Sequence, residues 1–118
     1  MIDLTPEMLR DFRGEVFKLL QKEHKFDYLI DIFELSGTSV CGEAGVILSA
    51  ARVGEMLYPV PDDHRLLAVS DRGVSIGYLP TSPVLLRAVR AGRNIFMRTE
   101  YSADLEGIPL IIVSLWCR

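Results

Sequence analysis

The sequence predicts an α+β domain, with a mostly antiparallel, barrel-like β-sheet, a helix at the amino terminus and a second helix near residues 83–91. Three features support this fold class. Apolar residues recur at helical spacing early in the chain, residues 66–79 have the pattern of a β-hairpin, and the carboxyl-terminal part holds two apolar runs of strand length. Because 118 residues suffice for one hydrophobic core, we expect one domain over residues 1–118.

The first helix is predicted from its start signal and its apolar stripe. Thr5 is a suitable N-cap, Pro6 suits the first helical position, and Leu4 can pack against Leu9. The helix should run to about Lys22, so residues 1–24 form an amino-terminal helical extension. Its buried stripe consists of Met8, Leu9, Phe12, Val16, Leu19 and Leu20.

Residues 26–35 fit both a helix and a strand. The polar, β-branched run that follows favours extended backbone, so we expect a strand from about Ile30 to Val40 with a kink at Gly37. Residues 46–49 suggest a second strand, and residues 50–58 a third strand or a helical turn.

The segment 59–63 is predicted to be a loop, because its two prolines remove backbone donors and restrict the residues before them. A hairpin follows, in which the strands 66–70 and 74–79 are joined by a turn with Gly73 at a position that needs positive φ.

The helix at residues 83–91 has clear boundaries. Ser82 is a good N-cap, Pro83 suits the first turn, and Gly92 ends the helix. Residues 94–101 and 108–116 then form two strands, joined by a loop at residues 102–107.

Charge is distributed unevenly along this chain of net charge −3. Residues 1–63 hold six basic and twelve acidic residues, whereas residues 64–118 hold seven arginines, no lysine and four acidic residues. Arginine recognises phosphate and carboxylate groups better than lysine does. A solvated surface that pairs with the acidic half is the alternative interpretation.

Composition also indicates where the protein functions. No apolar run approaches the length of about eighteen residues that a membrane span needs. The start of the chain lacks the basic and apolar regions of a signal peptide, so we expect a cytoplasmic protein. Cys41 and Cys117 are expected to be free structural thiols.

Residues suited to catalysis or metal binding are few. Cys41 and His64 could form a nucleophile–base pair, but nothing in the local sequence supports this geometry. Asp62, Asp63 and His64 could hold a cation, although a turn-capping role for the aspartates is the stronger reading. The spacing of cysteine, histidine and glycine matches no zinc or phosphate-binding motif. We therefore expect no metal, no cofactor and no enzymatic activity.

Two segments resemble the HIRAN domain family. They are Pro-Asp-Asp-His-Arg-Leu-Leu-Ala-Val at residues 61–69 and Gly-Val-Ser-Ile-Gly-Tyr-Leu-Pro at residues 73–80. Residues 35–38 and 108–116 are similar to the family's first and last strands, so the resemblance covers about residues 30–117. It implies a small β-barrel with helices that binds the 3′ end of single-stranded DNA.

By position, the resemblance implies that Asp63 recognises the terminal sugar of the DNA and that the ring of Tyr78 contacts the DNA strand. The chain departs from the family where Val60 and Arg65 replace two asparagines of the loop, and where residues 39–41 replace an arginine and two aromatic residues. The loss of stacking rings weakens the expected platform, since stacking contributes about 1–3 kcal/mol per base.

The leading hypothesis is a non-catalytic module that binds single-stranded nucleic acid. It uses Asp63 and Tyr78 near the strand end and places arginines at the phosphates, namely Arg65, Arg87, Arg90 and Arg93. The alternative is a protein–protein interaction module on the same fold, with no nucleic-acid binding. Self-association is left open, and no membrane partner is expected.

Overall fold

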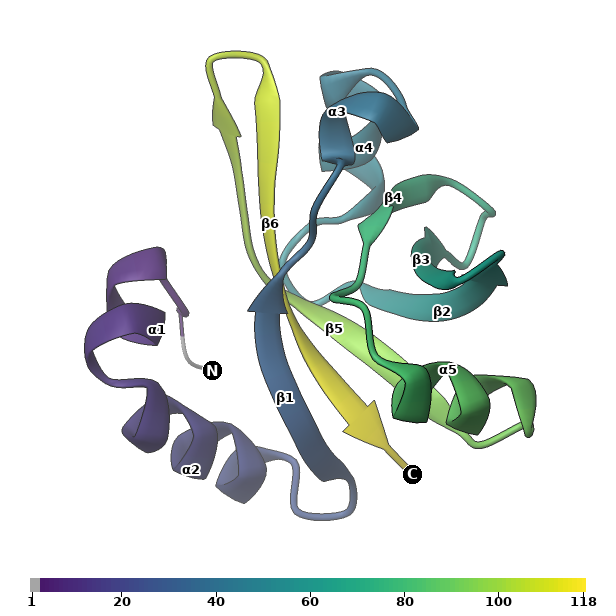
Figure 1. Cartoon of the computed structure of the whole chain (residues 1–118). Coiled ribbons are helices and arrows are strands. Elements are labelled where there is room, and N and C mark those ends of the chain that lie inside the picture. Colours follow the sequence, from purple (N-terminus) through teal and green to yellow (C-terminus); the bar gives the residue numbers. More distant parts are fainter. Residues whose placement is uncertain (1–2) are drawn as a thin grey trace.

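The computed structural model describes residues 3–118 and confirms the α+β class (Figure 1). Six strands form one antiparallel sheet in the order β1-β6-β5-β2-β3-β4. The strands are β1 (Tyr28–Glu34), β2 (Met56–Asp62), β3 (Arg65–Ser70), β4 (Ser75–Tyr78), β5 (Ile95–Leu105) and β6 (Ile108–Cys117). The helices are α1 (Pro6–Asp11), α2 (Arg13–Glu23), α3 (Thr38–Cys41), α4 (Ala44–Ala50) and α5 (Pro83–Arg90). The first two residues of the predicted extension lie outside the described part.

The sheet curls but is not closed into a barrel, which corrects the barrel-like expectation. An isolated antiparallel bridge joins Ser36, just after β1, to Tyr78 at the end of β4. Each backbone nitrogen of this pair donates to the other's carbonyl oxygen, at 2.9 Å and 2.7 Å. Before Ser36 the chain pairs with β6 and after Tyr78 it turns into α5, so the bridge does not extend into a ladder.

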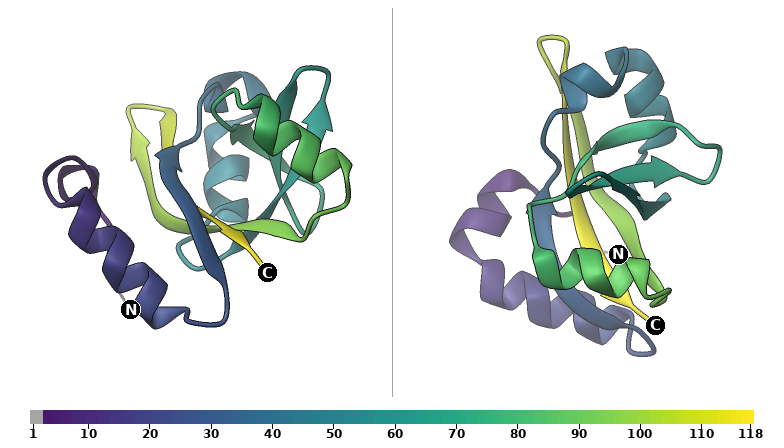
Figure 2. Two further views of the ribbon diagram at one scale, coloured as in Figure 1. Left: turned by 60° about the horizontal axis from the view of Figure 1, so that its bottom comes forward. Right: turned by 45° about the vertical axis from the view of Figure 1, so that its right-hand side comes forward.

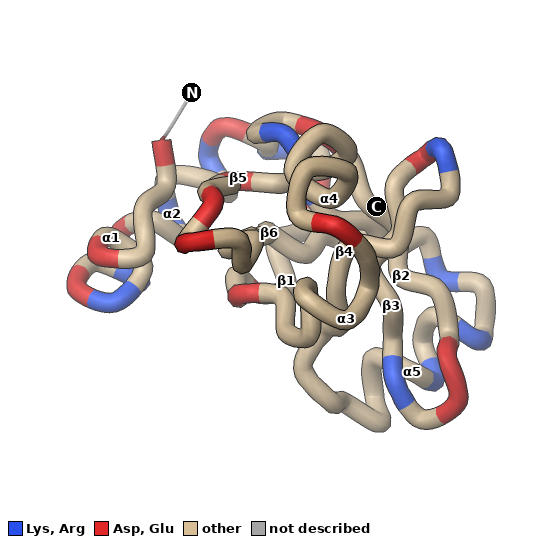
Figure 3. Tube along the Cα trace, turned by 90° about the horizontal axis from the view of Figure 1, so that it is seen from above, with Lys and Arg blue, Asp and Glu red and all other residues tan. Residues whose placement is uncertain are grey.

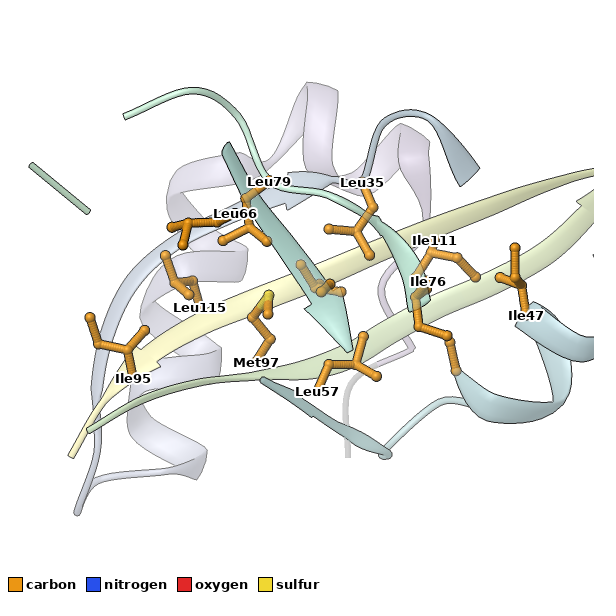
Figure 4. Packing of buried hydrophobic residues seen from close by; sticks show 13 residues of the cluster. Leu35, Ile47, Leu57, Leu66, Ile76, Leu79, Ile95, Met97, Ile111 and Leu115 are labelled. Carbon is orange, nitrogen blue, oxygen red and sulfur yellow. The ribbon is translucent and has the colours of Figure 1, made fainter. Parts of the chain in front are cut away.

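Helices cover both faces of the sheet (Figure 2). The larger hydrophobic cluster lies on the concave face, where Ile47 of α4 packs with apolar side chains of the strands (Figure 4). Apolar residues of α5 pack against the same cluster. A second cluster joins α1 and α2 to the other face, with Trp116 and Phe96 fully buried in it.

The amino-terminal helix begins as predicted, because the Thr5 hydroxyl accepts a hydrogen bond from the Met8 amide and Pro6 opens α1. The expected continuous helix is wrong, since Phe12 leaves the helical conformation with φ −131° and separates α1 from α2. The predicted buried stripe is confirmed only in part. Val16 and Leu20 are in the core, whereas Phe12 and Leu19 are exposed.

Two predicted strand segments are helical. The strand expected up to Val40 ends as β1 at Glu34, and Gly37, with φ +64°, turns the chain into α3. Residues 46–49 lie in α4, and Ile47 together with the C-cap residue Ala51, four positions later, enters the core. A short apolar run fits either a strand or a buried helix, and packing decided for the helix.

The loop expected at residues 59–63 is also wrong, because most of it belongs to β2. Pro59 and Pro61 pair with Ala68 and Leu66 of β3. β5 pairs with β2 only at Met56 and Leu57, so the edge of β2 that faces away from β3 is unpaired at the two prolines. No backbone N–H donor is needed on that edge, and the prolines are tolerated there.

The carboxyl-terminal predictions are largely confirmed. Gly73 has φ +83° in the β3–β4 turn, and the Ser82 hydroxyl accepts a hydrogen bond from the Leu85 amide at the start of α5. The loop predicted at residues 102–107 shrinks to a tight turn, because β5 continues to Leu105. Glu106 and Gly107 both take positive φ there.

Candidate binding surface on α5 and the β2–β3 turn

The β2–β3 turn places Asp63 at an exposed corner of the molecule. Its backbone is left-handed, with φ +57°, and its side chain is 84% exposed. The His64 Nε2 atom lies 3.7 Å from its Oδ1. Among the described residues, no backbone amide donates to this carboxylate, so the turn-capping role suggested by the sequence is not seen for Asp63.

Next to this turn, the guanidinium group of Arg65 lies over the ring of Tyr78. The guanidinium carbon of Arg65 is 3.9 Å from the centre of the Tyr78 ring, a cation–π contact. The Tyr78 hydroxyl donates to Asp62 Oδ2 at 3.0 Å, and Arg65 Nη2 donates weakly to Ser36 Oγ at 3.4 Å. Arg65 and Tyr78, predicted separately from the sequence, therefore form one unit with Asp62.

The Asp62 carboxylate affects both titratable neighbours. Its hydrogen bond and negative charge raise the pKa of Tyr78 above the ordinary value. Burial is the main reason that the pKa of the Cys41 thiol is raised, and Asp62 adds to it while Arg65 acts in the opposite direction. A raised thiol pKa disfavours the thiolate, which is the nucleophilic form.

The arginines of α5 divide between two places. Arg90 reaches the β2–β3 turn, where its Nη2 donates to the Asp63 carbonyl oxygen at 2.7 Å. Arg87 and Arg93 instead line a groove whose lining does not include Arg90. Figure 3 shows basic segments on α5 and at the start of β3 beside the acidic β2–β3 turn. The structure thus gathers Asp63, Arg65, Tyr78 and Arg90, and separates Arg87 and Arg93 from them.

The groove itself was not predicted from the sequence. It measures about 680 Å³ and lies between β1 and α5, with the end of β6 at its base. Apolar side chains make most of its lining, among them Ile30, Phe33, Leu85, Ala88 and Leu115. Strand register decides this arrangement, because a bulge in β1 between Leu29 and Asp31 changes which residues face α5.

A second hollow, of about 540 Å³, is more polar and lies between α4 and the β3–β4 turn. Arg52, Glu55, Asp71 and Arg72 contribute to its lining. No cluster of three or more metal-ligating side chains occurs between residues 3 and 118. Within the same range, no helix has the length and apolar character required to span a membrane.

Comparison with known proteins supports the fold and no family. No protein-family model and no curated protein matches the chain. A crystal structure of a protein from Lactobacillus plantarum, a structural-genomics target, is similar with a TM-score of 0.53. The two sequences are 15% identical over 75% of this chain and 95% of that one. At this identity the likeness concerns the fold alone, so the resemblance to HIRAN domains stays a prediction.

Proposed function

We propose that this protein is a non-catalytic module that binds the 3′ end of single-stranded nucleic acid at the β2–β3 turn. The observation that carries the proposal is the stacking of Arg65 on Tyr78, 3.9 Å from the ring centre, beside the exposed Asp63 carboxylate. The HIRAN-like sequence pattern assigns Asp63 and Tyr78 to the end of the nucleic-acid strand, whereas Arg65 stands where the family has an asparagine.

The Arg65–Tyr78 pair offers a platform for a base even though this chain, at residues 39–41, lacks the two aromatic residues of the family. Single-stranded bases stack on guanidinium planes as well as on aromatic rings. Tyr78 holds the guanidinium plane from one side, and the Arg65 residue is exposed to solvent. The other face of the Arg65 guanidinium is therefore available to a base, and its positive charge favours the adjoining phosphate.

Asp63 supplies a means of recognising the end of the strand. Its carboxylate accepts a hydrogen bond from a sugar hydroxyl and repels a terminal phosphate. Arg90 fixes the Asp63 backbone through the carbonyl oxygen, which holds the carboxylate at the corner beside the Arg65–Tyr78 pair. A 3′ hydroxyl is consequently preferred over a 3′ phosphate.

Fluorescence anisotropy with a short labelled oligothymidylate tests the proposal at low salt. We expect tighter binding to the strand with a 3′ hydroxyl than to the same strand with a 3′ phosphate, and an affinity that falls as salt increases. Asp63→Ala should remove the end preference. Arg65→Ala should weaken binding to both strands, because one stacked base is worth about 1–3 kcal/mol.

Arg72→Ala is the matched control, because Arg72 lies in the turn at the opposite end of β3. It removes the same charge and should leave the affinity unchanged. Equal binding of the two strand ends, equal losses for Arg65→Ala and Arg72→Ala, or no binding at low salt would each contradict a nucleic-acid site at this corner.

A further inference from the structure

The groove between β1 and α5 marks the place where the curled sheet stays open. Figure 1 shows the carboxyl-terminal half of β6 between these two elements. The bridge between Ser36 and Tyr78 joins the two edges at one point, and β1 and the chain after β4 separate from there. The resulting groove of about 680 Å³ is distinct from the β2–β3 turn, since neither Asp63, Arg65 nor Tyr78 lines it.

Apolar side chains are exposed along this groove. Val84, at the start of α5, is 69% exposed, and Ile30 on β1 is 45% exposed. Phe33, Leu85 and Leu115 continue the apolar lining toward the core. Contiguous exposed apolar surface of this kind marks interaction sites in proteins.

The charge at the groove is positive. Arg87 and Arg93 line it, both are exposed, and within the described chain neither makes an ion pair. Asp31, the acidic residue of the lining, is bound to Arg13 of α2 by an ion pair with a hydrogen bond. A partner that places carboxylates at Arg87 and Arg93 would therefore supply the missing counter-charges.

The edge of β1 indicates what form the partner takes. Gln21 of α2 accepts a hydrogen bond from the Leu29 amide at 2.8 Å, and Arg13 donates to the Ile32 carbonyl oxygen at 2.8 Å. The Leu29 N–H and the Ile32 carbonyl are therefore already hydrogen-bonded to side chains, and an added β-strand could not pair with them. The groove is thus suited to side-chain packing, as when the apolar face of a helix enters a groove.

We propose that the groove binds an amphipathic helical segment of a partner protein, with its apolar face against β1 and α5 and its acidic residues at Arg87 and Arg93. The charge of the groove makes an acidic segment the preferred partner. The same contacts disfavour a basic segment, because unpaired like charges would be brought together.

Selection from a random peptide display library tests this inference on the full chain. Peptides of about fifteen residues, long enough for four helical turns, are selected on the wild-type protein and synthesised with a fluorescent label. We expect them to carry apolar residues at helical spacing together with Asp or Glu. In anisotropy titrations, the double variant R87E/R93E should lose about tenfold or more in affinity, equivalent to about 1.4 kcal/mol.

Val84→Asp should weaken the same peptides, since it places a carboxylate on the exposed apolar rim. Arg90→Glu is the matched control on the same helix, because Arg90 reaches the β2–β3 turn and does not line the groove. It should leave peptide affinity unchanged while weakening oligonucleotide binding, so the two proposals can fail separately. Unchanged melting temperatures would verify that the exposed substitutions preserve the fold.

Three results would overturn the inference. The first is the absence of enriched peptides, and the second is enrichment of basic peptides or an equal loss with Arg90→Glu. The third is binding of a second copy of this chain in the groove, because Phe12, between α1 and α2, and Leu19 of α2 are exposed beside acidic residues. Light scattering that shows a wild-type dimer and an R87E/R93E monomer would assign the groove to self-association.

Discussion

The hydroxyl of Tyr78 donates a hydrogen bond to the Asp62 carboxylate at 3.0 Å, which connects the end of β4 to the end of β2. The same ring carries the Arg65 guanidinium on its face. An acidic residue thus fixes the ring from its edge while a basic residue covers its face. This arrangement orients Arg65, because both the ring and the Ser36 hydroxyl hold its guanidinium.

Replacing Asp62 by Asn should lower the pKa of Tyr78 toward its ordinary value. The phenolate is disfavoured in the wild-type protein because Asp62 accepts the phenolic proton and repels the negative charge that ionisation creates. An NMR titration of labelled tyrosine at alkaline pH measures the change. Asp63→Asn is the control, since the Asp63 carboxylate faces His64 and should not affect Tyr78. A pKa of Tyr78 that is the same in wild type and Asp62→Asn would contradict the hydrogen bond.

Gly77 occupies a close contact between β4 and the chain that follows β1. A Cβ atom at this position would lie 3.0 Å from Leu35 Cβ, 3.1 Å from the Ser36 carbonyl oxygen and 3.1 Å from Thr38 Cγ2. Gly77→Ala must therefore push the bridged segments apart, and we expect a loss of about 1–3 kcal/mol in the free energy of unfolding. Urea denaturation measures the loss.

Gly45→Ala is the matched control for that substitution. Nothing lies within 4 Å of the Cβ it would add, and Gly45 is inside α4. Alanine favours the helix, so this variant should gain about 0.5–1 kcal/mol. Opposite signs for the two variants would locate the effect at the β4 contact, whereas equal changes would show that no close approach exists at Gly77.

Local signals in the sequence predicted the elements whose structure depends on neighbours along the chain. The caps at Thr5 and Ser82 and the turn at Gly73 are determined by one residue and its backbone conformation, and they were predicted correctly. The errors concern segments decided by tertiary contacts. Residues 46–49 form a helix because Ile47 packs into the core, and Pro59 is accepted in β2 because its free edge is unpaired there.

The candidate site was predictable to the same extent. A family-like motif located Asp63 and Tyr78, and the basic charge of the second half of the chain pointed to Arg65. The hairpin β2–β3 and the strand β4 bring the three residues together. The sequence grouped Arg87, Arg90 and Arg93 as phosphate-facing arginines, but Arg90 reaches the Asp63 carbonyl oxygen whereas Arg87 and Arg93 line the groove. The Asp62 contact and the groove depend on strand register and on the curl of the sheet, and neither is visible in a short motif.

Leu20 should be needed for stability and Leu19 should not. Leu20 is 1% exposed and packs with Trp116 and Phe96 in the cluster beneath α2, whereas Leu19 is 50% exposed. Leu20→Ala is expected to cost about 2–5 kcal/mol through lost burial and the cavity that remains. Leu19→Ala should change stability by about 0.5 kcal/mol or less. Thermal unfolding of both variants tests the packing of α2, and similar losses for the two would show that this helix is packed differently.

Glu100 should make stability depend on pH. It is buried on β5, and it accepts a hydrogen bond from Ser114 Oγ at 2.6 Å, while Trp116 Nε1 donates to the same Oγ at 2.7 Å. Burial raises the pKa of Glu100 above its ordinary 4.5. Ser114, His24 and Arg98 oppose this shift in part, and the charge of Glu23 adds to it.

A raised pKa in the folded state means that folding favours the protonated carboxyl group. The contribution of Glu100 to the free energy of unfolding is therefore fully present below pH 4.5, the ordinary pKa of the group. This contribution is lost as the pH rises through the raised pKa of the folded state. Glu100→Gln keeps an oxygen that can accept the Ser114 hydrogen bond and cannot ionise. Relative to the wild type, its melting temperature should rise as the pH increases from about 4 to 8. Glu55→Gln, which removes an exposed carboxylate, is the control. A difference between wild type and Glu100→Gln that stays constant over this range would show that Glu100 does not ionise with a folding-dependent pKa.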